Sequence, residues 1–440
     1  MIDPFRDRRP CGLHSRPLQA LTATVVLVAC VAAGDAHAEA SPTPVAAGST
    51  VERANVEQWR QLLGPSIEWS VRRGGRLGVV AAQAIPEEPV RAAATRLYAP
   101  GVRLSADGRE MLDYVAGIPF PDVKADDPHA AAKLAHNAVR RINVDDLETE
   151  NPGCVGAALD PVRGMRHDRA YRFEHLRRLQ YRGRLVVPPT PTWTTPDGID
   201  YREMLGPMTE PFDLMGAGFT YVRYAGSGRQ DDSWLYHPEA RRVRRLSTAQ
   251  RSDGVFGTDI DLDSFGGFAA NPAWFEFRLI GKKPLLAAMH ARHTSARWNA
   301  PPADFLFEDD WEPRETWIVA ARALLPEYNF RERLVYIDAE SLLVPYTEAY
   351  GHDGRLWRAY VQQWGAGTID ATDPNSGQVH ATPSMFLVST LYLDVQQEHA
   401  TRCDFPATAD GRRPWRMFRG AGGTALPEAF DIATMIRAGR

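Results

Sequence analysis

Cysteine is scarce in this sequence, and two of its four cysteines, Cys11 and Cys30, fall within the first 38 residues. Only Cys154 and Cys403 remain beyond that segment. In an oxidising compartment we expect these two to form one long-range disulfide, and two buried free thiols are the alternative. Such a disulfide would tie the middle of the chain to its C-terminal part.

An excess of positive charge is also absent. The chain has 51 Lys and Arg against 55 Asp and Glu; without residues 1–38, which carry four Arg and three Asp, the balance becomes 47 against 52. Nucleic-acid binding depends on neutralising phosphates with surplus Lys and Arg. We therefore expect no nucleic-acid partner.

Beyond the N-terminus, no apolar run reads as a transmembrane helix. The N-terminal segment combines several arginines, an apolar run over 21–33 and Ala36-His37-Ala38. This pattern predicts a signal peptide over 1–38 and export to the periplasm. Alternatively, Leu27-Val28-Ala29-Cys30 is a lipobox, in which case a lipid on Cys30 would tether the protein to a membrane, the outer membrane above all.

Motifs of common enzyme classes are missing as well. Gly226-Ser227-Gly228 is not the Gly-x-Ser-x-Gly elbow of α/β hydrolases, and its position between strand-like stretches predicts a hairpin loop. Gly216-Ala217-Gly218 lacks the third glycine of a dinucleotide-binding loop, and no Walker loop is present. We expect no enzymatic activity and no cofactor.

Three polar groups are candidates for metal or catalytic sites. His290 and His293 could share an ion on a helix, but a polar loop is the simpler interpretation. The aspartates of 259–263 lack the glycine and glutamate of an EF-hand loop, and more simply pair with arginines. The acidic run 308–310 is interpreted as a solvated loop rather than an acid/base pair. We expect no metal site.

Helices are predicted in the first part of the chain. Residues 39–50 are small, polar and Pro-rich, which predicts a disordered lead-in. Asn55, with Gln58 in the capping-box position, predicts a short helix over 55–63. A second helix is expected from a cap at Asp127, with Pro128 in its first position and an apolar stripe extending to 142. We assign residues 51–165 to an N-terminal helical segment.

From about residue 170 the pattern changes to period two. Phe275, Phe277 and Leu279 alternate with charged residues, a spacing typical of a half-buried strand. Turn residues at 237–240 and 353–354 separate further short runs and favour hairpins. For residues 166–440 we predict a strongly curved antiparallel sheet with a C-terminal extension, within an α+β fold whose helices cover the concave side.

Aromatic residues make up 10% of the chain and are frequent in the predicted strands. Each alone is ordinarily part of a sheet core. A large curved sheet must nevertheless cover its concave face with helices or fill it with a ligand, so a set of them could line a site for an apolar molecule. The residues expected to bind such a ligand are Trp234, Tyr236, Trp274, Phe277, Trp317, Tyr336 and Trp357.

The run Arg241-Arg242-Val243-Arg244-Arg245 alternates on a predicted strand. Arginine binds phosphate and carboxylate groups bidentately, so one face could contact a lipid headgroup, a membrane surface or a partner's acidic patch. Alternatively, these arginines pair with nearby aspartates. Arg244 and Asp259 are the preferred pair, and both are candidates for headgroup or partner contact.

Short blocks follow one another along three quarters of the chain: Gly117-Ile118-Pro119-Phe120-Pro121, His136-Asn137, Ser233-Trp234-Leu235-Tyr236-His237-Pro238, Gly257-Thr258-Asp259, Gly281-Lys282-Lys283, Trp311-Glu312-Pro313-Arg314, Tyr336-Ile337-Asp338, Gly354-Arg355-Leu356-Trp357 and Gln396 to Ala400. No single block is specific. In their order they resemble the domain-of-unknown-function 1329 family, of the outer-membrane lipoprotein-sorting (LolA/LolB-like) type. One departure is His136, where the family has the Trp of a Trp-Asn pair.

The resemblance implies a half-open β-barrel with helices near its mouth, export, and an inner-membrane transporter of the RND (resistance-nodulation-division) type as a partner. It implies no catalytic residues. We therefore expect a periplasmic carrier or chaperone that binds a hydrophobic, lipid-like molecule without changing it chemically. One alternative is a docking scaffold between the transporter and an outer-membrane component, which a well-packed interior would favour. The other is a lipid or ester hydrolase, which needs a nucleophile and base within hydrogen-bond reach.

Overall fold

The computed structural model describes residues 47–142, 145–246, 251–372, 379–407, 415–417 and 427–439. The predicted signal peptide over 1–38, Cys30 and most of the predicted lead-in over 39–50 lie outside these ranges, although Thr50 already begins a strand. Residues from 45 onward form one unit by their internal contacts. In the part of the chain that the structure describes, no helix combines the length and apolarity needed to cross a bilayer.

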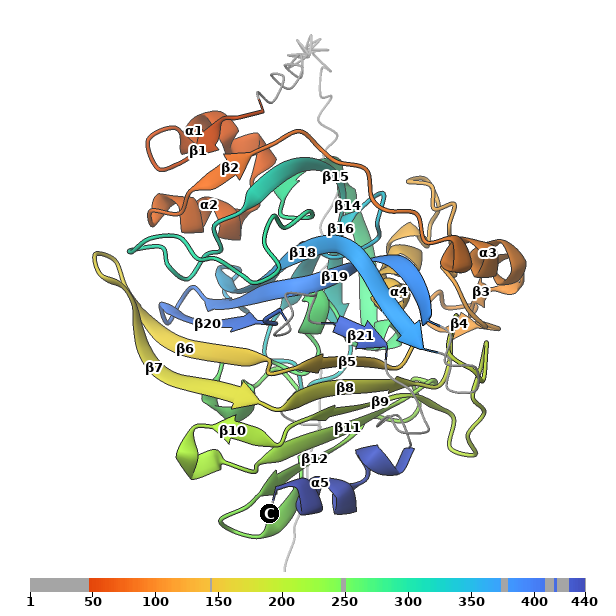
Figure 1. Cartoon of the computed structure of the whole chain (residues 1–440). Helices are drawn as coiled ribbons and strands as arrows, with labels where there is room; N and C mark the ends of the chain where they lie inside the picture. Colours follow the sequence, from red (N-terminus) through yellow and green to blue (C-terminus); the bar gives the residue numbers. More distant parts are fainter. Residues whose placement is uncertain are drawn as a thin grey trace, which may run out of the picture. The chain divides into compact units, whose positions relative to one another are not determined.

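Strands make up most of the described chain (Figure 1). The alternation at 275–279 does form a strand, β14, whose Glu276 and Arg278 are exposed while Phe275 is buried. The strands are β1 (Thr50–Val51), β2 (Leu77–Val79), β3 (Arg103–Leu104), β4 (Met111–Leu112), β5 (Leu147–Glu150), β6 (Gly153–Asp160), β7 (Gly164–Phe173), β8 (His175–Gln180), β9 (Ile199–Leu205), β10 (Met208–Glu210), β11 (Gly218–Tyr224), β12 (Asp232–His237), β13 (Arg242–Arg245), β14 (Phe275–Ala287), β15 (Asp310–Ala323), β16 (Glu332–Asp338), β17 (Tyr346–Tyr350), β18 (Leu356–Thr372), β19 (Val379–Asp394), β20 (His399–Asp404) and β21 (Trp415–Met417).

Two runs of antiparallel pairs form the main sheet. The first follows the order β14, β15, β16, β17, β18, β19, β20, β6, β7, β10. The second follows β21, β5, β8, β9, β11, β12, β13, and joins the first where β21 pairs in parallel with β18. β1 and β2, which are separated in sequence by α1 and α2, pair antiparallel, and β2 joins the sheet by a parallel pairing with β15. The β6–β20 pairing brings together strands that lie far apart in the sequence.

The helices are short and lie against different parts of the sheet (Figure 1). α4 packs against β14 and β15, and α5 packs against β11 and β12. Gly218 permits this second approach, because a Cβ atom there would lie 2.7 Å from Cγ of Met435. The helices are α1 (Val56–Trp59), α2 (Pro65–Arg72), α3 (Pro89–Tyr98), α4 (Ala130–Arg141) and α5 (Ile432–Ala438), with 3-10 turns η1 (Arg60–Leu62), η2 (Ala99–Gly101), η3 (Phe212–Leu214), η5 (Val255–Gly257), η6 (Phe265–Gly267), η7 (Pro272–Trp274) and η8 (Pro427–Phe430).

The ends of the predicted helices differ from the structure. α4 begins at Ala130 and not at Pro128, because Asp127 uses Oδ1 to accept the His129 amide and thereby forms a turn before the helix. Asn55 does precede α1, but its side chain bonds to Glu52 and Thr50, so the expected capping box does not form. The sheet also starts earlier than the expected boundary at residue 166, since β5 and β6 already belong to it.

Candidate ligand-binding cavity

An apolar cavity of about 140 Å³ lies between the sheet and the segment Arg251 to Phe265, which we term the cover loop. Strands β6, β7, β8, β9, β11, β19 and β20 supply one part of its wall, and the cover loop supplies the other. Aromatic and aliphatic side chains dominate the lining, so a molecule inside would exchange water for an apolar environment. The lining residues are Pro152, Cys154, Tyr171, Phe173, Leu176, Glu203, Leu205, Phe219, Val255, Phe256, Thr258, Ile260, Asp261, Leu262, Phe265, Thr390, Tyr392, Cys403 and Phe405.

The two carboxylates in the wall are already engaged with protein groups. Glu203 accepts from Nε of Arg178 at 2.6 Å. Asp261 accepts from Nη2 of Arg333 at 3.0 Å and from the hydroxyl of Tyr360 at 2.7 Å. Burial alone would lower the pKa of Arg333, but Asp261 and Tyr360 raise it overall. Because each carboxylate has a cationic partner, the cavity does not require a charged ligand.

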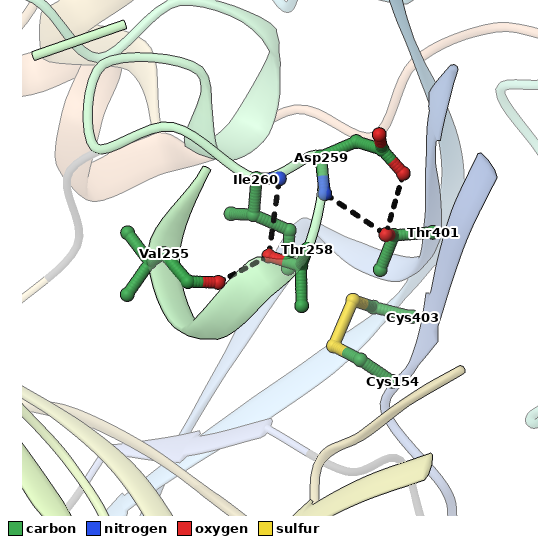
Figure 2. The surroundings of a disulfide bond; sticks show 7 residues. All are labelled: Cys154, Val255, Thr258, Asp259, Ile260, Thr401 and Cys403. Atoms are coloured by element: carbon green, nitrogen blue, oxygen red, sulfur yellow. Dashed lines mark hydrogen bonds between the residues drawn. A yellow bond between two sulfur atoms is a disulfide. The ribbon is translucent and has the colours of Figure 1, made fainter. Parts of the chain in front are cut away.

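A disulfide between Cys154 and Cys403 forms part of the cavity wall, which confirms the pairing expected from the sequence. The two cysteines face each other in the β6–β20 register, with Cα atoms 4.0 Å apart and 249 positions apart in sequence. Figure 2 shows the disulfide directly below the middle of the cover loop. The bond therefore holds β6 and β20 side by side, and both strands form part of the cavity wall.

The middle of the cover loop is held by a small polar cluster beside the disulfide (Figure 2). Oγ1 of Thr401 accepts from the Asp259 amide at 3.0 Å and donates to Oδ2 of Asp259 at 2.7 Å. His399 lies between Asp259 (Nδ1 to Oδ2, 2.7 Å) and Asp168 (Nε2 to Oδ2, 3.2 Å), and its hydrogen bond to Asp259 raises its pKa. This cluster stands at the partly exposed edge of the loop, since the His399 side chain is 22% exposed.

The ends of the cover loop are held by a fully buried network of ions. Asp263 bonds Nε of Arg251 at 2.9 Å and Nη2 of Arg223 at 3.1 Å, and Asp231 contacts both arginines. Tyr328 also donates its hydroxyl to Asp263 at 2.6 Å. Burial alone would raise the pKa of Asp263, but Arg251 and Arg223 lower it overall. Two arginines and two aspartates balance each other, so the network can be buried without net charge.

The Thr401 cluster is not arranged as a hydrolytic nucleophile and base. The Thr401 hydroxyl donates to Asp259, and the two His399 ring nitrogens face Asp259 and Asp168. A general base must be within reach of the hydroxyl proton that it removes, and His399 has no hydrogen bond to Thr401 in the described structure. The cluster therefore orients a loop.

The seven aromatic residues expected to bind a ligand lie elsewhere. Their side chains belong to three packed cores, formed where α5, α4 and the α1–α2 segment lie on the sheet. Sequence periodicity indicates which residues share a face of a strand, but not which element covers that face, and here helices do. None of the seven lines the cavity. Trp234 and Tyr236 pack near α5, Trp274, Phe277, Trp317 and Trp357 near α4, and Tyr336 in the core beside α2.

The preferred pair of Arg244 and Asp259 does not form in the described structure. Asp259 is taken by His399 and Thr401, as described above. Arg244 lies on β13 with its side chain exposed, opposite Leu235. The partners of Asp259 lie on β20, which pairs with β19 and β6, whereas β13 pairs with β12. The sequence did not show which strands are neighbours.

The other polar candidates also have defined structural roles. Nδ1 of His290 lies 2.5 Å from Glu312 Oε1, which gives it a carboxylate partner. Asp309 is buried and accepts from the backbone amides of Arg292 and Asp310, and Asp310 begins β15, so only Glu308 of the run 308–310 is exposed as a solvated loop would be. Where the structure is described, the group of potential metal ligands is instead Glu148, Glu150 and His175.

A nearby positive charge disfavours metal binding by Glu148, Glu150 and His175. Nε of Arg177 donates to Oε1 of Glu148 at 2.8 Å. A cationic guanidinium on a potential ligand atom opposes the binding of a second cation. We therefore assign no metal to these residues.

Sequence reasoning missed most of the cavity lining. Cys154, Cys403 and Asp259 to Asp263 were singled out, and they mark the wall and the cover loop. Tyr171, Phe173 and Phe219 gave no distinct signal, since aromatic residues are common in strands whether these line a cavity or a packed core. The predicted disulfide was the sequence feature that pointed to the site.

Fold and cavity together define a class: a sheet-dominated protein with an apolar cavity between strands and a loop. The model of the protein family of unknown function DUF1329 matches residues 50–416. The chain belongs to this family. No curated protein matches the sequence.

Solved structures resemble the chain at low identity. A domain named as an outer membrane lipoprotein-sorting protein from Vibrio parahaemolyticus is 12% identical, with a TM-score of 0.45, covering 69% of this chain and 97% of its own. A DUF1329 family protein from Desulfovibrio piger is 14% identical, with a TM-score of 0.46 and coverages of 70% and 98%. A LolA superfamily protein from Nitrosomonas europaea is 16% identical, with a TM-score of 0.34 and coverages of 62% and 90%. Similarity at this level does not transfer a function.

Proposed function

We propose that the protein is a non-enzymatic carrier of a hydrophobic, lipid-like molecule, which it holds between the sheet and the cover loop. The observation that supports this is the apolar cavity, whose two carboxylates are engaged with protein cations. Burial of apolar surface supplies affinity at roughly 25 cal/mol per Å², as an upper estimate. No step of this function changes the ligand covalently.

The volume of the cavity indicates that loading requires the cover loop to move. A buried apolar cavity of about 150 Å³ accommodates benzene. The cavity of about 140 Å³ thus holds a ring or a short alkyl segment, but not a whole acyl chain. The described conformation corresponds to a closed state, and opening of the loop middle would enlarge the space.

The same proposal includes a cellular location and partners, which are inferred from the sequence. The predicted signal peptide over 1–38 supports a periplasmic location, and a lipid on Cys30 would add outer-membrane association. We further propose a half-open β-barrel whose concave side receives the ligand. An RND-type inner-membrane transporter and an outer-membrane component are the proposed partners, on the strength of the resemblance in sequence blocks.

The direct test is native mass spectrometry of protein purified from a native-like envelope, followed by lipid extraction. A co-purifying apolar molecule that is released on unfolding is the expected result, and it would identify the ligand class. Protein that carries no lipid and takes none from envelope extracts would contradict the carrier, and would favour the docking scaffold.

A second test locates the binding site. The uncharged dye N-phenyl-1-naphthylamine should gain fluorescence with the wild-type protein and lose most of that gain when Leu205→Trp fills the cavity. Leu279→Trp is the matched control, because Leu279 is also half-buried on a strand but packs near α4, away from the cavity. Equal dye binding by both variants would place the site elsewhere.

A further inference from the structure

A second cavity, of about 240 Å³, is lined in part by Arg223 of the buried ion network and shares no lining residue with the apolar cavity. It is formed by α4, β4, β9, the β11–β12 loop and η7. Unlike the apolar cavity, it is lined by many polar and charged side chains, among them Arg140, Arg182, Asp200 and Arg223. Its chemistry is therefore unrelated to that of the first cavity.

Three arginines and three carboxylates line this cavity, and not all of them are paired with one another. Arg223 is neutralised by the buried aspartates of the ion network. Arg140 donates through Nη1 to Oδ1 of Asp200 at 2.8 Å. The partner of Arg182 is neutral: Nη2 donates to the backbone oxygen of Tyr114 at 3.0 Å. Across the described ranges, no carboxylate lies within ion-pair distance of Arg182, so its guanidinium has no direct ion-pair partner.

An unbalanced guanidinium in a half-buried position is costly, because its charge is partly removed from water. Burial lowers the pKa of Arg182, and the charge of Arg140 lowers it further. On α4, burial and then the same Arg140 charge lower the pKa of His136 to about 4, although its bond to the Arg109 oxygen opposes this. In both cases burial is the largest cause, and for Arg182 the carboxylate of Asp200 acts in the opposite direction.

Neutral donors and two acids complete the surroundings. Ser227 and Asn271 offer a hydroxyl and an amide within the lining. Asp113 also lies in the lining and is paired with Arg103 at 2.8 Å, while Glu110 accepts from the hydroxyl of Ser227. These acids would repel a doubly charged ligand more than a singly charged one.

We propose that this second cavity binds the carboxylate of a small organic acid, with Arg182 as its main contact and Arg140 as its neighbour. Arginine matches a carboxylate with two parallel hydrogen bonds, and Arg182 lines the cavity without a carboxylate of the protein at ion-pair distance. The volume exceeds that of the carboxylate itself, so the site accommodates a short organic body as well. The site is independent of the apolar carrier function.

Isothermal titration calorimetry with benzoate and butyrate, against chloride at equal ionic strength, tests this site. We expect saturable binding to the wild-type protein and a loss of about tenfold or more in affinity in Arg182→Gln. Arg96→Gln is the matched control, since Arg96 is exposed on α3 and lies outside the cavity lining. Inorganic phosphate should bind more weakly than benzoate, because the two acids oppose a second negative charge.

Two further variants keep the test decisive. Asp200→Asn removes the carboxylate that competes for the arginines, so it should tighten carboxylate binding while Arg182→Gln weakens it. If Arg182→Gln does not fold, Arg182→Lys replaces it; lysine keeps the charge but loses the bidentate geometry, and affinity should still fall several-fold. No binding of any carboxylate to the wild type, or equal binding by wild type and Arg182 variants, would overturn the proposal.

The source of the carboxylate is distinguished by chain length. Benzoate and butyrate binding that depends on Arg182 identifies a free small acid. Binding of dodecanoate that depends on Arg182, without binding of butyrate, identifies the headgroup of an amphiphile. Dodecanoate binding that is unaffected by Arg182→Gln but lost in Leu205→Trp would belong to the apolar cavity, and would count against the second site.

Discussion

The ends and the middle of the cover loop are held by different kinds of interaction. At the ends, Arg251 and Asp263 belong to a network that is buried completely. In the middle, Asp259 is held by one hydroxyl and by a histidine that is partly exposed. Buried, mutually satisfied ions are costly to separate, whereas a few part-exposed hydrogen bonds are not. We therefore expect the loop to open at its middle while its ends stay in place, which the proposed carrier function requires.

We expect the largest loss of unfolding free energy from a substitution at the ends of the cover loop. Asp263→Asn keeps the shape of the side chain but leaves two buried arginines with one aspartate, and should cost about 3–5 kcal/mol of unfolding free energy. Urea unfolding measures it. Asp213→Asn is the control, since its pair with Arg169 is exposed and should be worth less than about 1 kcal/mol. Similar losses in both variants would show that burial does not distinguish the two anchors.

Removal of the disulfide should cause the next largest loss of unfolding free energy. Replacing Cys154 and Cys403 together by serine should lower the unfolding free energy by about 2–4 kcal/mol, because the bond closes a long loop of the unfolded chain. The same variant should also bind the naphthylamine dye less tightly, since both sulfur atoms belong to the cavity wall. Unchanged stability after reduction of the wild type would contradict this.

At the middle of the loop the effect should be smaller and mainly dynamic. Thr401→Val removes the hydroxyl that bonds Asp259 twice, at a cost of about 1 kcal/mol. Native-state hydrogen exchange should become faster at residues 255–260 but stay unchanged at the amides beside Asp263. The dye should also enter faster. Uniform acceleration along the whole loop would mean that ends and middle open together.

The smallest effect should be the pH dependence of the His399 contact. The pKa of His399 is raised in the folded protein, so its contribution is fully present below the unfolded value near 6.5 and is lost as pH rises through the folded value. The stability difference between wild type and His399→Gln should thus shrink from pH 6 to pH 8, by less than about 1 kcal/mol. A difference that grows with pH would rule out this role.

Local patterns in the sequence predicted local structure well. The alternation from Phe275 to Leu279 forms β14, and the turn at 237–240 joins β12 to β13. Leu134 and Ala138 of the predicted apolar stripe are buried on α4. Each of these features depends on neighbours in the sequence, which is the information that periodicity and turn residues carry.

Long-range neighbours could not be predicted in the same way. The partner of Asp259 is His399, and Trp317 faces the region of α4 and not the cavity. Both facts depend on which strands lie side by side, and a single sequence contains no direct signal for this. Cys154 and Cys403 are the exception, because two thiols that remain in an oxidising compartment have only each other as partners.

The β6–β20 pairing has a consequence for how the protein is made. Translation delivers β6 first and β20 almost 250 residues later, so the wall that Cys154 and Cys403 share is incomplete for most of synthesis. A chain still emerging has the early strands of the site but not their closing neighbour. If the protein is the proposed carrier, its cavity is completed only after β20 has been made, so an apolar ligand is loaded after synthesis and not during it.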